Sequence, residues 1–370
     1  MVHTSDSLDD LIPRLEDLYR DLHAHPELSF QEHRTAGIVT DWLQGCDGVE
    51  VTEGIGGTGI VGVLENGTGP VVALRADMDA LPVREATGLP YASECIGTDP
   101  RGNEVPIAHA CGHDMHVACL LGAVRRLAAD RSTWSGTLLA IFQPAEELVS
   151  GAKAMVADGL FDRVPRPDVV LGQHVAPLPA GVIGLRSGPA FASVDAFRVT
   201  LHGRGGHGSR PETTVDPVVM AASTVLRLQT VVSREVAGDD VAVVTVGSLH
   251  AGTKSNIIPD EAELLVNVRS YKEAVRDRVL TSMRRIIEGE AATAGAPRPP
   301  DIVEEESSPA LVNDADAATR TTPALAAVSG VGLVVDPGPV TGSEDVGVLA
   351  SACGAPLVFW LLGGADPAAF

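Results

Sequence analysis

At 370 residues the chain is longer than a usual single hydrophobic core, so two domains are expected. Its composition, 45% hydrophobic and 21% charged, is ordinary for a soluble globular protein. A net charge of −22 argues against nucleic acid or an anionic membrane surface as a partner, because both would need basic patches.

The cysteines and the N-terminus bear on the cellular compartment. The five cysteines are odd in number and widely scattered, which is typical of reduced thiols in a cytoplasm: Cys46, Cys95, Cys111, Cys119 and Cys353. The N-terminal MVHTSDSLDD is acidic and lacks an apolar core, so no signal peptide is expected. No apolar run approaches the length needed to span a bilayer. We therefore expect a cytoplasmic protein.

Two helices are predicted near the N-terminus. Leucines spaced by three and four residues predict an amphipathic helix over residues 7–22. Pro26 interrupts the pattern, and a second helix is expected from about Ser29 to Leu43. His23 and His25 lie between these helices; we interpret them as structural or pocket-lining side chains, with metal ligation as the alternative.

A glycine-rich hairpin is predicted over residues 51–63. Its GIGGTG run is not a phosphate loop, because no Lys-Ser or Lys-Thr follows and the run leads into a strand. The next strand begins at Val71 and ends in Asp77 and Asp79. Carboxylates at the carboxyl end of a buried strand lie where open α/β sheets form their sites. The alternative is a pair of solvated loop acids.

The densest group of chemically active side chains lies in residues 106–116, PIAHACGHDMH. His109, Cys111 and His113 alternate, so an extended backbone would point all three to the same side. Gly112 would allow a tight bend. Thiolate and imidazole are preferred ligands of zinc and similar metals, so the group predicts a metal site. The alternative is a buried free cysteine beside surface histidines.

A helix is predicted to follow this group. Asp114 is a suitable N-cap, and an apolar face continues to Leu127. His116 and Cys119 lie on this helix and are interpreted as packing groups or as supports for neighbouring ligands.

Two more buried strands are predicted to end in polar side chains. Residues 136–142 lead into the adjacent Glu146 and Glu147, which we expect to diverge, so that one can bind a metal while the other takes a proton. Residues 167–172 lead into Gln173 and His174. The strand ends would together deliver acids, histidine and cysteine to one rim.

The pattern changes from about Ser187 onward. Alternating strands and helices in the order β-α-β-β-α predict a compact sheet with helices on one face, an inserted α+β domain. The helix predicted over 216–229 is apolar on most sides, so it is expected to pack against a further surface. The remainder has a Pro-rich link, a helix near 315–328 and a final strand, PLVFWLL.

Taken together, the motifs resemble the aminoacylase/carboxypeptidase family of two-metal amidohydrolases. They are DLHAHPELSFQEHRTA, LRADMDALPVRE, AHACGHDMH, FQPAEE, GQHV, GRGGHGSRPE and GTKSNIIPDEAEL. The nearest branch holds hippurate hydrolase, auxin-conjugate hydrolases and N-acetyl-diaminopimelate deacetylase. The resemblance implies a zinc-peptidase-like α/β catalytic domain (1–186 and 296–370), interrupted by a ferredoxin-like α+β dimerisation or lid domain (187–295).

The resemblance also implies roles for individual residues. The protein ligands of two divalent ions, zinc or manganese with cobalt or nickel as alternatives, would be Cys111, His113, Glu147 and His174. Glu146 would be the general base, and Asp79 would orient His113. Asp77 stands where many relatives have a histidine, so it would be an extra ligand or a supporting group.

Three residues of the inserted domain complete the implied site. His207 resembles the histidine that reaches a neighbouring subunit's site, which implies a homodimer or a higher homo-oligomer. Asn256 and Arg269 resemble the residues that hold the substrate's amide and carboxylate.

The implied reaction is hydrolysis of an N-acyl (acetyl, benzoyl or similar) amino acid to a carboxylate and a free amino acid. One alternative is a dipeptidase or carboxypeptidase of the same family. A second follows from a departure: relatives carry a further metal-binding histidine near the C-terminus, whereas no histidine follows His250 here. The chain would then be truncated, or a weakly active metal-binding relative with one incomplete metal site.

Overall fold

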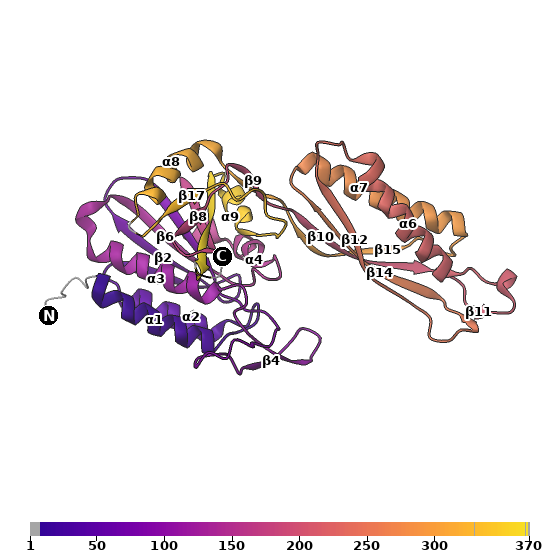
Figure 1. The fold of residues 1–370 in the computed structure, drawn as a ribbon. Coiled ribbons are helices and arrows are strands. Elements are labelled where there is room, and N and C mark those ends of the chain that lie inside the picture. The colour runs from indigo at the N-terminus through magenta and orange to yellow at the C-terminus, as the bar shows by residue number, and fades with distance from the viewer. Residues whose placement is uncertain (1–7, 329, 367, 369–370) are drawn as a thin grey trace. The chain divides into compact units, whose positions relative to one another are not determined.

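The computed structural model describes residues 8–328, 330–366 and 368 (Figure 1). Residue 7, the first of the predicted helix 7–22, lies outside these residues. So does most of the N-terminal segment MVHTSDSLDD, for which no signal peptide is expected. The chain forms two compact units: a first unit of Met1–Ala190, Val312–Gly338 and Asp345–Phe370, and a second unit of Phe191–Leu311 and Pro339–Glu344.

An eight-stranded sheet forms the centre of the first unit. In spatial order its strands are β1 (Val49–Ile55), β2 (Gly59–Asn66), β6 (Gly136–Gln143), β3 (Val71–Asp77), β7 (Val169–Pro179), β18 (Leu357–Ala365), β8 (Val182–Gly184) and β17 (Leu333–Val335). The strand β3 is parallel to both β6 and β7, and β7 is parallel to β18. The carboxyl ends of β3 and β6 therefore meet at one edge, as predicted. A small hairpin of β4 (Ile96–Thr98) and β5 (Glu104–Pro106) lies outside this sheet.

The strand β7 is longer than predicted. Its parallel pairing with β18 continues beyond residue 172, with Trp360 opposite Gln173 and Leu361 opposite His174. His174 therefore lies within the strand and not after its end. The partner strand, far downstream in the sequence, extends β7 in this way.

Helices cover both faces of this sheet (Figure 1). They are α1 (Leu8–Ala24), α2 (His33–Gln44), α3 (His113–Ala129), α4 (Gly151–Ala157), α5 (Leu160–Arg163), α8 (Ala315–Ala326) and α9 (Val346–Cys353). Leu22 of α1, Leu43 of α2 and Leu121 of α3 share one core cluster with Phe142 of β6. The leucine spacing that predicted the first helix thus marks its buried face.

Two predicted helix starts are wrong. The second helix begins at His33 and not at Ser29, because Phe30 has a left-handed backbone (φ +62°) that a helix cannot contain. The N-cap of α3 is Gly112. Asp114 lies inside the first turn of α3, where its Oδ2 accepts a hydrogen bond of 2.6 Å from His23 Nδ1.

The second unit has a ferredoxin-like β-α-β-β-α-β order. Its sheet runs β12 (Ala242–Ala251), β14 (Glu261–Ser270), β10 (Val194–His202) and β15 (Asp301–Ser308), with α6 (Pro217–Glu235) and α7 (Glu273–Ala294) packed against it. A small ladder pairs β11 (Gly206–His207) with β13 (Ile257–Ile258). The helix predicted from residue 216 is capped there by Asp216, whose Oδ1 accepts from the backbone N–H of Val218 over 2.8 Å.

The second unit extends beyond the boundary expected after residue 295. The strand β15 pairs along β10 and so completes the sheet of this unit, whereas residues 296–370 were assigned to the returning catalytic segment. The chain passes from the first unit to the second within β9 (Gly188–Phe191) and returns at β16 (Leu311–Asn313). Within the described residues, no helix is long and apolar enough to cross a membrane.

Candidate active site

Arg75 and Asp77 form a fully buried ion pair at the end of β3. Arg75 Nη1 donates to Asp77 Oδ2 over 2.6 Å, and its Nε donates to Gln143 on β6 over 2.9 Å. Burial alone raises the pKa of Asp77, but the charges of Arg75 and His113 hold it well below its usual range. Asp77 is therefore an ionised interior group, which excludes the alternative of a solvated loop acid.

Asp79 binds the backbone that follows β6. Its Oδ1 accepts from the N–H of Glu146 and its Oδ2 from the N–H of Glu147, each over 3.0 Å. The Ser29 hydroxyl donates to Oδ2 over 2.6 Å. Burial raises the pKa of Asp79, yet His113 and the Ser29 hydroxyl bring it below its ordinary value. An ionised Asp79 thus fixes the turn that carries the adjacent glutamates.

The turn after β6 brings both glutamates to the same point. Ala145 has a left-handed backbone (φ +48°), and the N–H of Val149 donates to the carbonyl of Glu146 over 2.6 Å. Glu146 Oε2 and Glu147 Oε1 each lie 3.8 Å from Nε2 of His113. The expectation that these side chains diverge is wrong, because the tight turn replaces the extended backbone on which neighbours alternate.

Gly112 determines the direction of His113. Its φ is +76°, and a Cβ here would lie 2.3 Å from Cγ1 of Val175, so only glycine fits. Residues 110–111 form a turn, and His113 is the first residue of α3. The predicted alternation of His109, Cys111 and His113 is therefore wrong. His109 is buried, and neither of its ring nitrogens has a hydrogen-bond partner among the residues that the structure describes.

His113 lies at the centre of a ring of carboxylates. Its Nδ1 is 3.4 Å from Asp79 Oδ1 and its Nε2 is 3.5 Å from Asp77 Oδ2, in addition to the two glutamates. These separations exceed the roughly 2.7–3.2 Å of an ordinary hydrogen bond, and within the described part of the chain neither ring nitrogen has a hydrogen-bond partner.

The spacing around His113 suits a divalent cation. Two ligand atoms of a tetrahedral zinc, each bonded at about 2.1 Å, lie roughly 3.4 Å apart. The separations between Nε2 and the surrounding carboxylate oxygens are close to this value. Buried imidazole nitrogens without hydrogen bonds, facing several acids, are costly unless a cation lies between them. The residues present therefore fit a metal.

His116 supports this cluster through hydrogen bonds at both of its ring nitrogens. Its Nδ1 lies 2.5 Å from Asp77 Oδ1, and its Nε2 accepts from the backbone N–H of Val175 over 2.8 Å. Both ring nitrogens are thus engaged, as in a neutral ring that donates to Asp77. Burial lowers the pKa of His116 to about 4, against the pull of Asp77. The predicted packing and supporting role matches these contacts.

Cys111 and His174 flank the cluster. Burial raises the pKa of the Cys111 thiol, and the neighbouring Glu147 raises it further. A cation would have the opposite effect and stabilise the thiolate. The ring of His174 lies 5.7 Å from that of His113 between centroids, and its Nδ1 donates to the carbonyl of Val175 over 2.6 Å. This leaves Nε2 of His174 as the nitrogen with a free lone pair.

Sequence reasoning missed the buried network behind the site. Gln143 Nε2 donates to Asp345 Oδ1 over 2.5 Å, and Asp345 Oδ2 accepts from the N–H of Ala152 over 3.0 Å. Glu32 is likewise fully buried. A polar Gln143 at the end of the apolar run GTLLAIFQ was a usable signal, whereas nothing in the sequence around Asp345 points to it.

The candidate residues of the second unit are divided between two places. His207 is exposed on β11, where its Nδ1 accepts from the Ser209 hydroxyl over 2.8 Å, and the N–H of Gly208 donates to the carbonyl of Asn256 over 2.9 Å. Arg269 lies near the far end of β14 and donates to the carbonyl of Thr341 over 2.8 Å. The eight steps from residue 261 to residue 269 span about 26 Å of strand, so Arg269 is not gathered with the other two.

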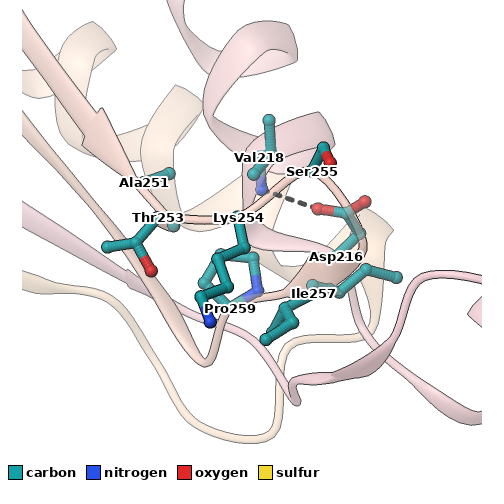
Figure 2. A pocket seen from close by; sticks show the side chains of 10 residues that line it. Asp216, Val218, Ala251, Thr253, Lys254, Ser255, Ile257 and Pro259 are labelled. Atoms are coloured by element: carbon teal, nitrogen blue, oxygen red, sulfur yellow. Dashed lines mark hydrogen bonds between the residues drawn. The ribbon is translucent and has the colours of Figure 1, made fainter.

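A pocket of about 440 Å³ opens beside the loop that carries Asn256 (Figure 2). Thr253, Lys254 and Ser255 line it from the loop, and Asp216 and Val218 line it from the start of α6. The pocket adds polar groups of both charges next to the small ladder of β11 and β13.

Comparison with known proteins places this geometry in context. Residues 73–369 match the model of peptidase family M20/M25/M40. The chain is 41% identical over 286 residues to N-acetylcysteine deacetylase of Bacillus subtilis (strain 168), covering 76% of this chain and 72% of that protein. It is 38% identical over 331 residues to thermostable carboxypeptidase 1 of Saccharolobus solfataricus, covering 88% and 80%.

A solved structure shares both the fold and the family. The Bacillus subtilis YXEP protein, described as a dinuclear metal binding peptidase from the M20 family, superposes with a TM-score of 0.77 at 33% identity, covering 96% of this chain and 89% of that one. With the ring of carboxylates around His113 and the match over most of its length, the chain belongs to peptidase family M20/M25/M40 and is a metal-dependent hydrolase of amide bonds.

Proposed function

We propose that this protein hydrolyses the amide bond of N-acyl amino acids, releasing a carboxylate and a free amino acid. The observation that carries the proposal is His113, a buried imidazole without hydrogen bonds within the described chain that faces Asp77, Glu146 and Glu147. A relative 41% identical is named N-acetylcysteine deacetylase, which supports an acyl amino acid as the substrate.

The metal would be held by four side chains: Cys111, His113, Glu147 and His174. When bound, two divalent ions would lower the pKa of the attacking water and polarise the scissile carbonyl. Thiolate, imidazole and carboxylate ligands together suit zinc or manganese, with cobalt or nickel as alternatives. Asp79 would fix the ring of His113 from the side away from the metal, since its Oδ1 lies 3.4 Å from Nδ1. Asp77 lies 3.5 Å from Nε2, on the side that faces the glutamates, and would be an extra ligand or a supporting group.

Glu146 would be the general base. It would accept a proton from the water that attacks the carbonyl carbon, and donate a proton to the amine nitrogen as the C–N bond breaks. Its position supports this role, because Asp79 fixes its backbone N–H and its carboxylate lies 3.8 Å from His113.

The second unit would supply the substrate contacts. We assign stabilisation of the oxyanion to His207, the amide contact to Asn256 and the carboxylate contact to Arg269. Asn256 lies before the start of β14 and Arg269 lies near its end, and the strand from residue 261 to residue 269 spans about 26 Å. The two side chains would therefore serve one small substrate only if they come from different chains.

A homodimer or a higher homo-oligomer is therefore part of the proposal. Val219 and Leu226 on α6 are 65% and 73% exposed, and β12 is an edge strand of the sheet. An apolar helix face beside an open strand edge is well suited to pair with a second copy. The five cysteines are all free, which supports a reducing cytoplasm as the compartment.

The test of the function is a substrate panel. We expect acetyl- and benzoyl-amino acids to be hydrolysed with a higher kcat/KM than dipeptides, and the Glu146→Gln variant to retain its metal but lose about 10³-fold or more in kcat, the upper range for a general base. Faster cleavage of dipeptides would favour the carboxypeptidase alternative suggested by the 38% identical relative. Bound metal without hydrolysis of any substrate would favour the weakly active relative.

A further inference from the structure

The turn that carries Glu146 and Glu147 is held by two buried carboxylates. Three consecutive backbone N–H groups point to them: that of Ala145 donates to Glu32 Oε1 over 2.9 Å, and those of Glu146 and Glu147 donate to Asp79. Each of these donors follows β6 and would otherwise be unsatisfied in the interior. The acceptors come from two other parts of the chain.

Glu32 lies in the short segment between α1 and α2 and is 0% exposed. The same Oε1 that accepts from Ala145 also accepts from the N–H of Phe30 over 2.9 Å, and Oε2 accepts from the Thr58 hydroxyl over 2.5 Å. One side chain thus joins three segments, at residues 30, 58 and 145. A carboxylate so placed is costly to bury, so its contacts must return that free energy.

Two of the joined segments are strained. Phe30 and Ala145 both have left-handed backbones, with φ of +62° and +48°. Such a conformation costs roughly 1–3 kcal/mol for a residue other than glycine and persists only where the surroundings enforce it. In both residues the backbone N–H donates to Glu32 Oε1. The same segment also supplies the Ser29 hydroxyl that donates to Asp79.

We propose that Glu32, with Ser29, positions the turn 145–147, and thereby sets where the carboxylates of Glu146 and Glu147 stand. Glu32 acts through hydrogen bonds from backbone N–H groups and the Thr58 hydroxyl, so it is a positioning residue. This inference rests on the proposed function for its kinetic consequences, but not for its effect on metal binding. The inference gives the segment HPELSFQE a defined role in the site, although this segment does not lie at the end of a predicted strand.

The experiment separates the length of the side chain from its charge. Glu32→Gln keeps the reach and an acceptor oxygen for both backbone donors, while Glu32→Asp keeps the charge but loses the reach. The matched control is Glu27→Asp, since Glu27 lies in the same segment and also accepts two backbone hydrogen bonds, from Arg34 over 2.9 Å and Thr35 over 2.8 Å, but none from the turn.

Two readouts are taken for each full-length protein: kcat and KM on the best acyl amino acid, and the Kd for Mn²⁺ by titration calorimetry. We expect Glu32→Asp to lower kcat at least 30-fold with little change in KM and to weaken Mn²⁺ binding about tenfold. Glu32→Gln and Glu27→Asp should stay within about threefold of the wild type in both readouts.

Three results would overturn the proposal. One is a folded Glu32→Asp variant with unchanged kcat and Mn²⁺ affinity, another is equal losses in Glu32→Asp and Glu27→Asp, and the third is a loss in Glu32→Gln as large as in Glu32→Asp. If Glu32→Asp does not fold, Ser29→Ala is measured in its place, with an expected loss of about fivefold in kcat. Unchanged kcat and Mn²⁺ affinity in Ser29→Ala would then overturn the proposal. A wild type that binds Mn²⁺ but cleaves no substrate would contradict the proposed function. The comparison of Mn²⁺ affinities by calorimetry would still test the role of Glu32 in positioning the turn.

Discussion

At the scale of single residues, His23 links the first helix to the start of α3. Its Nδ1 lies 2.6 Å from Asp114, its Nε2 lies 3.1 Å from Glu85, and its ring packs against Tyr19 and Tyr91. Hydrogen bonding to Asp114 raises the pKa of His23 to about 9, against the effect of burial and with help from Glu85. Because the pKa is raised on folding, protonated His23 stabilises the fold.

The resulting prediction concerns stability against pH. The contribution of His23 is fully present below its unfolded pKa near 6.5 and is lost as the pH rises through about 9. We expect His23→Gln to lower the free energy of unfolding by about 2 kcal/mol at pH 6, and by clearly less at pH 9.5. Urea denaturation at the two pH values measures this. A difference that does not depend on pH would contradict the assignment of the proton to His23.

The sequence predicted some of the buried acidic residues of the site but not others. Asp77 and Glu146 each follow an apolar run, and both are buried, as such a pattern predicts. Glu147 follows the same run and is partly buried. Asp345 and Glu32 gave no such signal, because their partners lie far away in the chain: Gln143 for Asp345 and Ala145 for Glu32. The role of such a buried polar group depends on contacts that form only when the chain folds.

At the scale of elements, the junction of a turn and α3 places His113, and Gly112 makes the junction feasible. A Cβ at residue 112 would both occupy a left-handed backbone and overlap Val175. We expect Gly112→Ala to lower the free energy of unfolding by about 2–4 kcal/mol, the sum of backbone strain and overpacking. Metal affinity should fall with it, because His113 is the next residue.

The control for this prediction is Gly88→Ala. Gly88 has nearly the same φ, +71°, but nothing within 4 Å of its Cβ position. Gly88→Ala should lower the free energy of unfolding by about 1 kcal/mol through backbone strain alone and leave the metal affinity of the protein unchanged. Equal effects of the two substitutions, in denaturation and in metal titration, would show that contact with Val175 has no part in placing His113.

Local patterns predicted the type of most elements and failed at particular ends. Leucine spacing predicted α1, and apolar runs predicted β3 and β6. The end of β7 was missed because β18 extends it, and the start of α2 because Phe30 is left-handed. These ends are determined by a distant strand and by a buried carboxylate, neither of which appears in a local window.

At the scale of the whole molecule, the two-part organisation followed from the change of pattern near residue 187, but the second boundary did not. The sequence DIVEEESS of β15 lacks the apolar alternation of a half-buried strand, since half of the residues of this edge strand are exposed. Only its pairing with β10 identifies it as the sixth element of the ferredoxin-like unit.

The proposed assembly gives a prediction at this scale. If α6 packs against a second copy, Leu226→Asp should convert the oligomer to a monomer in sedimentation velocity and lower kcat at least 100-fold, because His207 and Asn256 would no longer reach a partner's site. Leu333→Asp is the control, an exposed leucine (57%) on β17 in the first unit. An oligomer that survives Leu226→Asp, or a monomeric wild type, would contradict this arrangement.

In the proposed metal site, Cys111 joins His113 and the glutamates around divalent ions, and Co²⁺ gives a direct spectroscopic test of this ligation. Thiolate coordination to Co²⁺ gives an intense charge-transfer absorption that imidazole and carboxylate ligands do not give. We predict this band in the Co²⁺-loaded wild type, its loss in Cys111→Ser, and its retention in Cys95→Ser, whose thiol instead donates to the carbonyl of Ala24. A wild type without the band, or a band that persists in Cys111→Ser, would contradict the account.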